Sequence, residues 1–147
     1  MKLLAIAFMA FFSANVTWSG DFDAAKMQAA QQHKLILVNF SGSDWCGPCI
    51  RLRKEILESA TFENYATDHL LLVRADFPRQ KKNQLSKEQV KLNEALADKY
   101  NPEGRFPYTL LVDETGKVLF QWDGFPNESP DQFVSQIDQI VLARKGS

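Results

Sequence analysis

The chain has 147 residues, of which 45% are hydrophobic and 24% are charged, and its formal net charge is −1. This length supports one domain with a sizeable core. The balanced charge excludes the strongly basic or acidic proteins that bind nucleic acid or membranes through charge alone, so we expect no nucleic-acid partner.

The first residues have the pattern of a secretory signal peptide. Lys2 is followed by the apolar run Leu3–Phe12 and then by small and polar residues, as in segments that direct export. The apolar run is too short to span a bilayer comfortably as an uncleaved anchor. We therefore expect a signal peptide over residues 1–19, cleaved between Ala14 and Gly20, and no stable membrane insertion afterwards.

The first half of the mature chain alternates helical and strand patterns. A helix is expected from Asp21 to about His33, because small and apolar residues recur there at helical spacing. The run Leu35–Phe40 is too apolar for a half-exposed strand and predicts a central, buried one. A helix over Ile50–Glu58 and a short turn through Thr61–Tyr65 follow, and Leu70–Ala75 is a second buried strand.

The second half begins with a basic loop and ends with a hairpin and a helix. The loop Asp76–Lys82 is expected to be exposed to solvent, or else to border a substrate surface. Ser86 opens a capping-box pattern for a helix to about Tyr100. Two further strands, Tyr108–Val112 and Lys117–Trp122, are expected, joined by a tight turn that contains Gly116. A last helix is expected to be capped at Ser129. Residues 20–147 are therefore expected to form one α/β domain, with a central mixed sheet of about four strands and helices on both faces.

The only two cysteines lie between the first buried strand and a helix, in the motif Trp45-Cys46-Gly47-Pro48-Cys49. The first N–H groups of a helix lack partners within it, and the helix dipole adds partial positive charge there. A thiolate at this place is stabilised, so we expect a lowered pKa for Cys46 and assign it as the nucleophile. Cys49, one turn further on, is expected to be more buried and to resolve the mixed disulfide.

Two other uses of a Cys-x-x-Cys pair are less favoured. A zinc site usually needs four ligands, but there is no second cysteine pair, and His33 and His69 belong to no ligand-spaced motif. A purely structural disulfide across so short a loop would restrain the unfolded chain little. We therefore expect no metal and no cofactor other than a redox-active Cys46–Cys49 disulfide.

With this motif, the chain resembles the thioredoxin-like superfamily over about residues 20–145. The five motif residues are identical to the thioredoxin active site, and the approach Phe40–Asp44 is closer to secreted thioredoxin-like proteins of bacterial envelopes. The resemblance implies the thioredoxin-like fold and an exported thiol–disulfide oxidoreductase, located in the bacterial periplasm or secreted.

The resemblance also assigns residues outside the motif. Pro107, preceded by Phe106, matches a cis proline that faces the dithiol and helps to hold an extended substrate. Gly124 matches a glycine that keeps the substrate surface flat. The residues implied to shape the active site are Trp45, Gly47, Pro48, Phe106, Pro107 and Gly124. Asn39 stands where thioredoxin has a buried aspartate beneath the dithiol, and since asparagine cannot titrate, proton transfer must use water or another group.

The Gly-Pro centre of the motif resembles reductases more than strong oxidants, so we expect a protein disulfide reductase. It would act on substrate proteins with disulfides or thiols, receive electrons from an envelope donor, and be a monomer. The alternatives are a disulfide oxidase or isomerase, or a non-catalytic binding or chaperone module on a thioredoxin scaffold. The intact cysteine pair argues against the last, because a pure binder needs neither thiol.

Overall fold

The computed structural model describes residues 16–147, so residues 1–15 of the predicted signal peptide lie outside the described part. The strands are β1 (Trp18–Ser19), β2 (Leu35–Ser41), β3 (Leu70–Asp76), β4 (Tyr108–Val112) and β5 (Val118–Asp123). The helices are α1 (Phe22–Gln32), α2 (Gly47–Leu52), the π-helical turn η1 (Arg53–Leu57), α3 (Ala60–His69), the 3-10 turn η2 (Lys81–Asn83), α4 (Lys87–Tyr100) and α5 (Pro130–Lys145).

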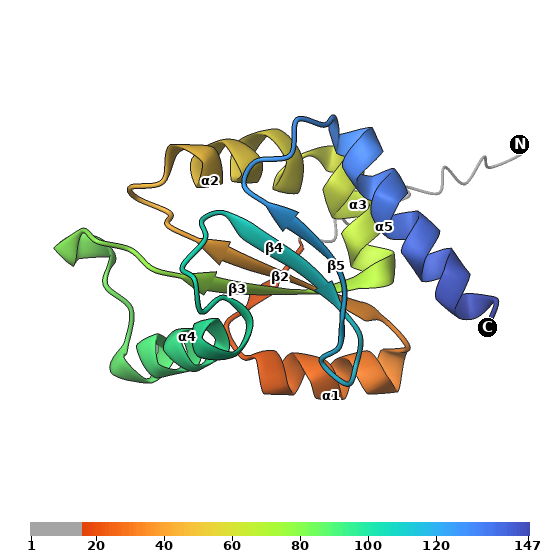
Figure 1. Cartoon of the computed structure of the whole chain (residues 1–147), viewed down its shortest axis with the longest axis horizontal. Helices are drawn as coiled ribbons and strands as arrows, with labels where there is room; N and C mark the ends of the chain where they lie inside the picture. Colours follow the sequence, from red (N-terminus) through yellow and green to blue (C-terminus); the bar gives the residue numbers. More distant parts are fainter. Residues whose placement is uncertain (1–15) are drawn as a thin grey trace, which may run out of the picture.

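The described strands form one mixed sheet in the order β1-β3-β2-β4-β5 (Figure 1). β3 pairs in parallel with β1 and β2, whereas β4 pairs antiparallel with β2 and β5. β2 is central and all of its residues are buried. The predicted α/β architecture, with a central mixed sheet and helices on both faces, is confirmed.

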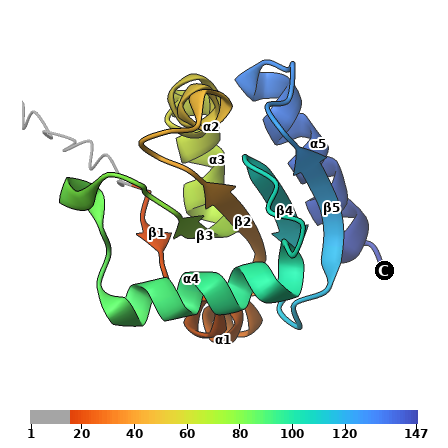
Figure 2. The same cartoon turned by 60° about the vertical axis from the view of Figure 1, so that its left-hand side comes forward.

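Alternating side chains of β2 enter two separate cores. Leu35 and Leu37 pack with α2, α3 and α5, whereas Ile36 and Val38 pack with α1 and α4. Figures 1 and 2 show these two groups of helices on opposite faces of the sheet. Because successive side chains of a strand point to opposite faces, a strand covered on both sides needs an uninterrupted apolar run.

Two elements differ from the sequence-based expectation. β1 adds a fifth strand that was not predicted, since two residues carry no periodic pattern and their pairing with Leu72–Val73 is long-range. The short turn expected at Thr61–Tyr65 is wrong: this segment belongs to helix α3. The Ser59 hydroxyl accepts the Phe62 N–H at 3.2 Å, and Phe62 is buried in the core. A capping serine and this apolar contact therefore start a new helix directly after η1.

Within residues 16–147, no helix combines the length and the apolar character that a membrane crossing needs.

Candidate active site

The dithiol lies at the carboxyl end of β2, where the chain turns into α2. The Gly42 carbonyl accepts the N–H groups of Trp45 at 3.3 Å and Cys46 at 2.9 Å, which closes the turn. Cys46 is the N-cap residue of α2, and its Sγ accepts the backbone N–H of Cys49 at 3.3 Å. The sulfur of Cys46 thus takes the capping role that a serine or aspartate oxygen usually has.

The two cysteines are joined in a disulfide. Cys46 is 5% exposed and Cys49 is 3% exposed, so both are buried and the expected difference between them is small. The Gly42 N–H also points to the Cys49 Sγ at 3.5 Å. Gly47 and Pro48, between the cysteines, are exposed. The part of the motif that faces solvent is therefore this two-residue bridge between the cysteines.

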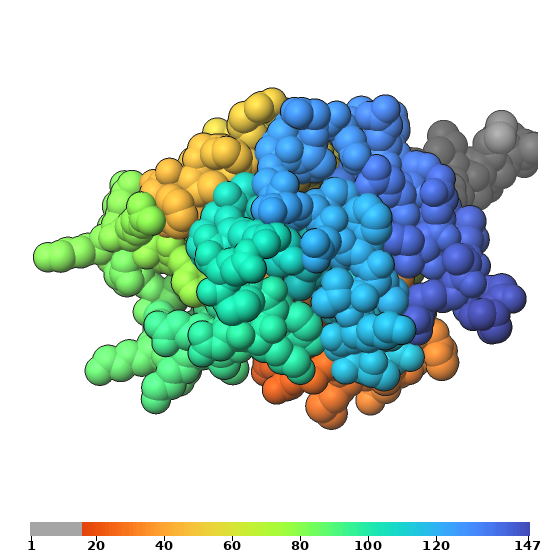
Figure 3. Space-filling view, viewed as in Figure 1, coloured from red at the N-terminus to blue at the C-terminus, as the bar shows by residue number. Residues whose placement is uncertain are grey.

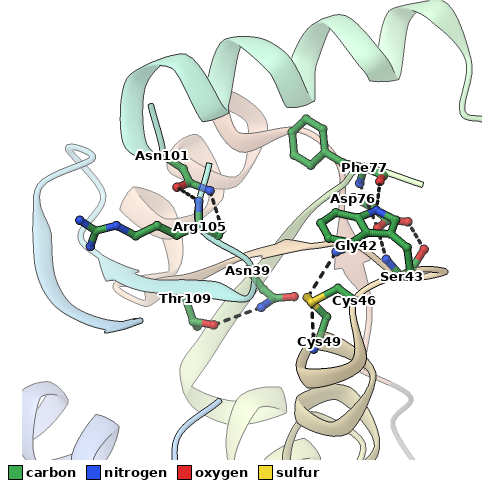
Figure 4. The surroundings of a disulfide bond; sticks show 11 residues. Asn39, Gly42, Ser43, Cys46, Cys49, Asp76, Phe77, Asn101, Arg105 and Thr109 are labelled. Atoms are coloured by element: carbon green, nitrogen blue, oxygen red, sulfur yellow. Dashed lines mark hydrogen bonds between the residues drawn. A yellow bond between two sulfur atoms is a disulfide. The ribbon is translucent and has the colours of Figure 1, made fainter. Parts of the chain in front are cut away.

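Asn39 lies beside the dithiol (Figure 4). It is 3% exposed, and its Nδ2 donates to the Thr109 hydroxyl at 3.1 Å across the β2–β4 pair. Among residues 16–147, this is the hydrogen bond that the Asn39 side chain makes. Because neither side chain titrates, this buried pair cannot supply a proton to the thiols or take one up.

Phe106, Pro107 and Gly124 lie at the same end of the sheet, where β4 starts and β5 ends. The Phe106–Pro107 peptide bond is cis. The Gly124 N–H donates to the Pro107 carbonyl at 2.9 Å, and Gly124 has a φ of 83°, which side chains rarely adopt. No atom lies within 4 Å of the position that a Gly124 Cβ would occupy, so the surface beside Pro107 is open.

Trp45 connects the motif to a distant segment. Its indole Nε1 donates to the Phe77 carbonyl at 2.7 Å. Its ring centroid lies 5.4 Å from that of Phe106, which in turn lies 5.5 Å from that of Phe77. Edge-to-face contacts of this kind are favourable, so three aromatic side chains from separate parts of the chain meet beside the dithiol.

Four residues of the site were not predicted from the sequence, namely Gly42, Ser43, Asp44 and Asp76. The Asp76 carboxylate accepts the backbone N–H of Ser43 at 2.9 Å and contacts its hydroxyl. The Asp44 carboxylate accepts the N–H groups of Arg79 and Gln80, each at 2.9 Å. The sequence signal for this loop was its small and acidic residues directly before Cys46. Their hydrogen-bond partners could not be predicted, because these partners are distant in the chain.

Charged side chains near the site are largely paired. Arg51 contacts Glu55 at 3.0 Å, and Arg105 contacts Asp123 at 3.1 Å as well as Glu103. Among residues 16–147 there is no group of three or more histidine, cysteine or acidic side chains that could hold a metal ion. The two sulfur atoms of Cys46 and Cys49 can exchange disulfides with other thiols.

Comparison with known proteins gives the family. A model of the thioredoxin-like domain matches residues 22–140. The chain belongs to the thioredoxin-like domain family. With its Cys46–Cys49 disulfide, this thioredoxin-like protein is an enzyme of the thiol–disulfide oxidoreductase class.

Individual relatives agree with this family. The chain is 35% identical to the disulfide bond reductase DsbH of Chlamydia pneumoniae over 132 residues, which are 90% of this chain and 76% of DsbH. It is 27% identical to the thioredoxin-related protein DsbJ of the same organism, over 88% of this chain but only 36% of DsbJ. A solved structure of a DsbH oxidoreductase superposes with a TM-score of 0.78 at 33% identity, covering 96% of this chain and 93% of the other.

Proposed function

We propose that this thioredoxin-like protein is an exported protein disulfide reductase. The observation that carries the proposal is the capping role of Cys46: its sulfur receives the Cys49 N–H at 3.3 Å at the start of α2. A backbone donor already aimed at that sulfur, together with the helix dipole, favours its thiolate in the reduced enzyme. The similarity to a protein named as a disulfide bond reductase supports the reducing direction.

The reaction proceeds in two exchanges. The Cys46 thiolate attacks one sulfur of a substrate disulfide, a mixed disulfide forms, and the other substrate sulfur leaves and takes up a proton. The Cys49 thiolate then attacks the Cys46 sulfur, which closes the Cys46–Cys49 disulfide and releases the second substrate thiol. The substrate gains two electrons and two protons, and an electron donor of the envelope restores the dithiol.

The surrounding residues hold the substrate in place for this exchange. We assign the open backbone at Pro107 and Gly124 to an extended substrate segment, and the rings of Trp45 and Phe106 to its apolar side chains. Neither Gly47 nor Pro48 has a bulky side chain that would block the approach of a substrate to Cys46. Asn39 stays neutral, so the proton of Cys49 moves through water or through another group that titrates.

Export to the periplasm, or secretion, follows from the signal pattern. We propose that cleavage within the expected window occurs on the N-terminal side of Val16. The contacts of the following residues support this, since Trp18 and Ser19 belong to β1 and Arg74 lies 4.1 Å from the Trp18 ring centroid. Cleavage nearer Gly20 would remove that strand. Sequencing the N-terminus of the exported protein tests this placement, and a mature chain that lacks Trp18 would contradict it.

A trapping experiment tests the mechanism. A Cys49→Ser variant cannot resolve the mixed disulfide, so it should accumulate substrate proteins bound to Cys46 that a reductant releases. A Cys46→Ser variant serves as the control and should trap nothing and lose insulin-reducing activity. Equal trapping by both variants, or full activity of Cys46→Ser, would contradict the assignment.

The direction of exchange is tested separately by the reduction potential. A reductase should equilibrate near the thioredoxin value of about −270 mV, whereas a strong oxidant lies near about −120 mV. A value at the oxidising end would replace the reductase by a disulfide oxidase.

A further inference from the structure

A basic segment lies against the dithiol loop and has no role in the exchange described above. It runs over residues 77–84, between β3 and α4, and carries the exposed side chains of Arg79, Lys81 and Lys82. We call these three side chains the basic platform. Figure 3 shows the light-green atoms of this segment projecting beside the orange atoms of the chain that leads to α2.

Asp44 fixes the segment to the active-site loop. Its carboxylate accepts the N–H groups of Arg79 and Gln80 at 2.9 Å and the Asn83 Nδ2 at 3.0 Å. The Gln80 side chain donates back to the Asp44 carbonyl at 3.3 Å. The N–H of Arg79 is the main reason that the pKa of Asp44 lies below its ordinary value. The segment is therefore held in one arrangement by the residue two positions before Cys46.

Arg79 extends over the active-site tryptophan. Its guanidinium carbon lies 3.7 Å from the centroid of the Trp45 ring, within the range of a cation–π contact. The same ring also donates its Nε1 hydrogen bond to the carbonyl of Phe77, the first residue of the segment. One positive charge of the platform thus lies directly on the residue that precedes the nucleophile.

The platform keeps its charge available, unlike the other arginines around the site. Arg51 and Arg105 are engaged with acidic side chains. Within the described residues, Arg79, Lys81 and Lys82 take part in no ion pair. Two acidic side chains close in the fold accept other donors, Asp44 the N–H groups of this segment and Asp76 the N–H and hydroxyl of Ser43.

We propose that the basic platform docks an acidic segment of the partner protein, next to the disulfide that is exchanged at Cys46–Cys49. The inference rests on the proposed function and specifies its substrate class: proteins with Asp or Glu close to a reactive disulfide. Complementary charge beside the reacting atoms raises the rate of encounter and suppresses partners of the wrong sign. A protein is favoured over an anionic membrane because the platform flanks the dithiol, where a flat lipid surface offers nothing to exchange.

The test uses three disulfide-containing peptides that differ only in the residues flanking the disulfide, which are acidic, neutral or basic. The second-order rate of their reduction by the reduced enzyme is measured at low and high salt. We expect the acidic peptide to react about tenfold faster than the neutral one at low salt, and the basic one to react most slowly. High salt should remove most of the difference.

Matched variants locate the effect. Replacing Arg79, Lys81 and Lys82 by glutamine should abolish the preference for the acidic peptide, so that the ratio of its rate to that of the neutral peptide falls to about one. The control replaces Lys91, Lys117 and Lys145 by glutamine; these exposed lysines lie on α4, before β5 and on α5, and the change in net charge is the same. This control should keep the preference.

Equal rates for the three peptides, or equal loss of preference in both triple variants, would overturn the proposal. A second readout separates this result from a failure of the reductase function. Binding of the oxidised enzyme to the same peptides with serine in place of cysteine is followed by NMR. If the wild-type enzyme binds the acidic peptide and the platform variant does not, the docking proposal is supported whether or not disulfide exchange is seen. If instead only sedimentation with phosphatidylglycerol vesicles depends on the platform, a membrane surface replaces the protein partner.

Discussion

Gly42 lies under the indole ring of Trp45, and no larger residue fits there. A Cβ on Gly42 would lie 2.3 Å from the Trp45 Cε2, far inside contact distance. The ring therefore rests on bare backbone, where it can reach the Phe77 carbonyl and Phe106. The position of the tryptophan in the active-site motif thus depends on a glycine three residues before it.

We predict that Gly42→Ala displaces the Trp45 ring and slows insulin reduction by about tenfold to a hundredfold, since small misplacements near a reacting centre are costly. Gly146→Ala is the matched control, because its Cβ would make only ordinary contacts, the nearest at 3.8 Å. Unchanged activity in Gly42→Ala would contradict this account of Trp45.

Asn39 is a buried, non-titrating residue beside the dithiol. It is 3% exposed, so a carboxylate there would be poorly solvated and its pKa would be raised. We predict that Asn39→Asp adds an ionisation to the pH–rate profile that the wild-type enzyme and Asn39→Ser lack. Because its folded-state pKa is raised, the new carboxyl also destabilises the fold increasingly above its unfolded pKa of about 3.9. Identical pH–rate profiles for all three proteins would show that position 39 has no contact with the proton path.

Asp113 joins the β4–β5 turn to helix α5. Its carboxylate accepts the N–H groups of Thr115 at 2.9 Å and Lys117 at 3.0 Å, and it lies 3.6 Å from Arg144. Burial raises the pKa of Asp113, but hydrogen bonds from Thr115 and Lys117 and the charge of Arg144 outweigh it, so the pKa is lowered. The ionised form is thus the one that the fold stabilises.

We predict that Asp113→Asn lowers the free energy of unfolding by about 1–2 kcal/mol at neutral pH. A lowered folded-state pKa gives stability above the unfolded value and loses it as the pH falls, so the difference should shrink below about pH 4. Urea unfolding at several pH values measures it. The control Glu114→Gln, in a surface pair with Arg144, should change stability by less than about 0.5 kcal/mol. A pH-independent difference for Asp113→Asn would contradict the linkage.

Across the fold, the sequence predicted the features that depend on local pattern. The apolar run Leu35–Phe40 indicated the central strand because both faces of β2 are covered. The Cys46–Cys49 spacing before a helix placed the dithiol at the end of that strand, where the structure has it. These features rest on residues that are neighbours in the chain.

What the sequence did not predict depends on partners that are distant in the chain. β1 exists because Trp18–Ser19 pairs with Leu72–Val73, and two residues carry no strand signal of their own. The segment after β3 was expected to be exposed to solvent or to border a substrate surface, but its attachment to the active-site loop was not predicted. That attachment comes from Asp44, which lies 35 and 36 residues from the two N–H groups that it accepts. Hydrogen bonds between residues so far apart in the chain depend on the complete fold, and they leave no periodic pattern in the sequence.

We propose that the start of α2 makes Cys46 acidic in the reduced enzyme. The most direct measurement is the pH dependence of alkylation of Cys46 in the Cys49→Ser variant, followed by mass spectrometry. We predict half-maximal reactivity clearly below the ordinary thiol value of about 8.5 and rapid alkylation at neutral pH. An ordinary value, with slow alkylation at neutral pH, would contradict the account.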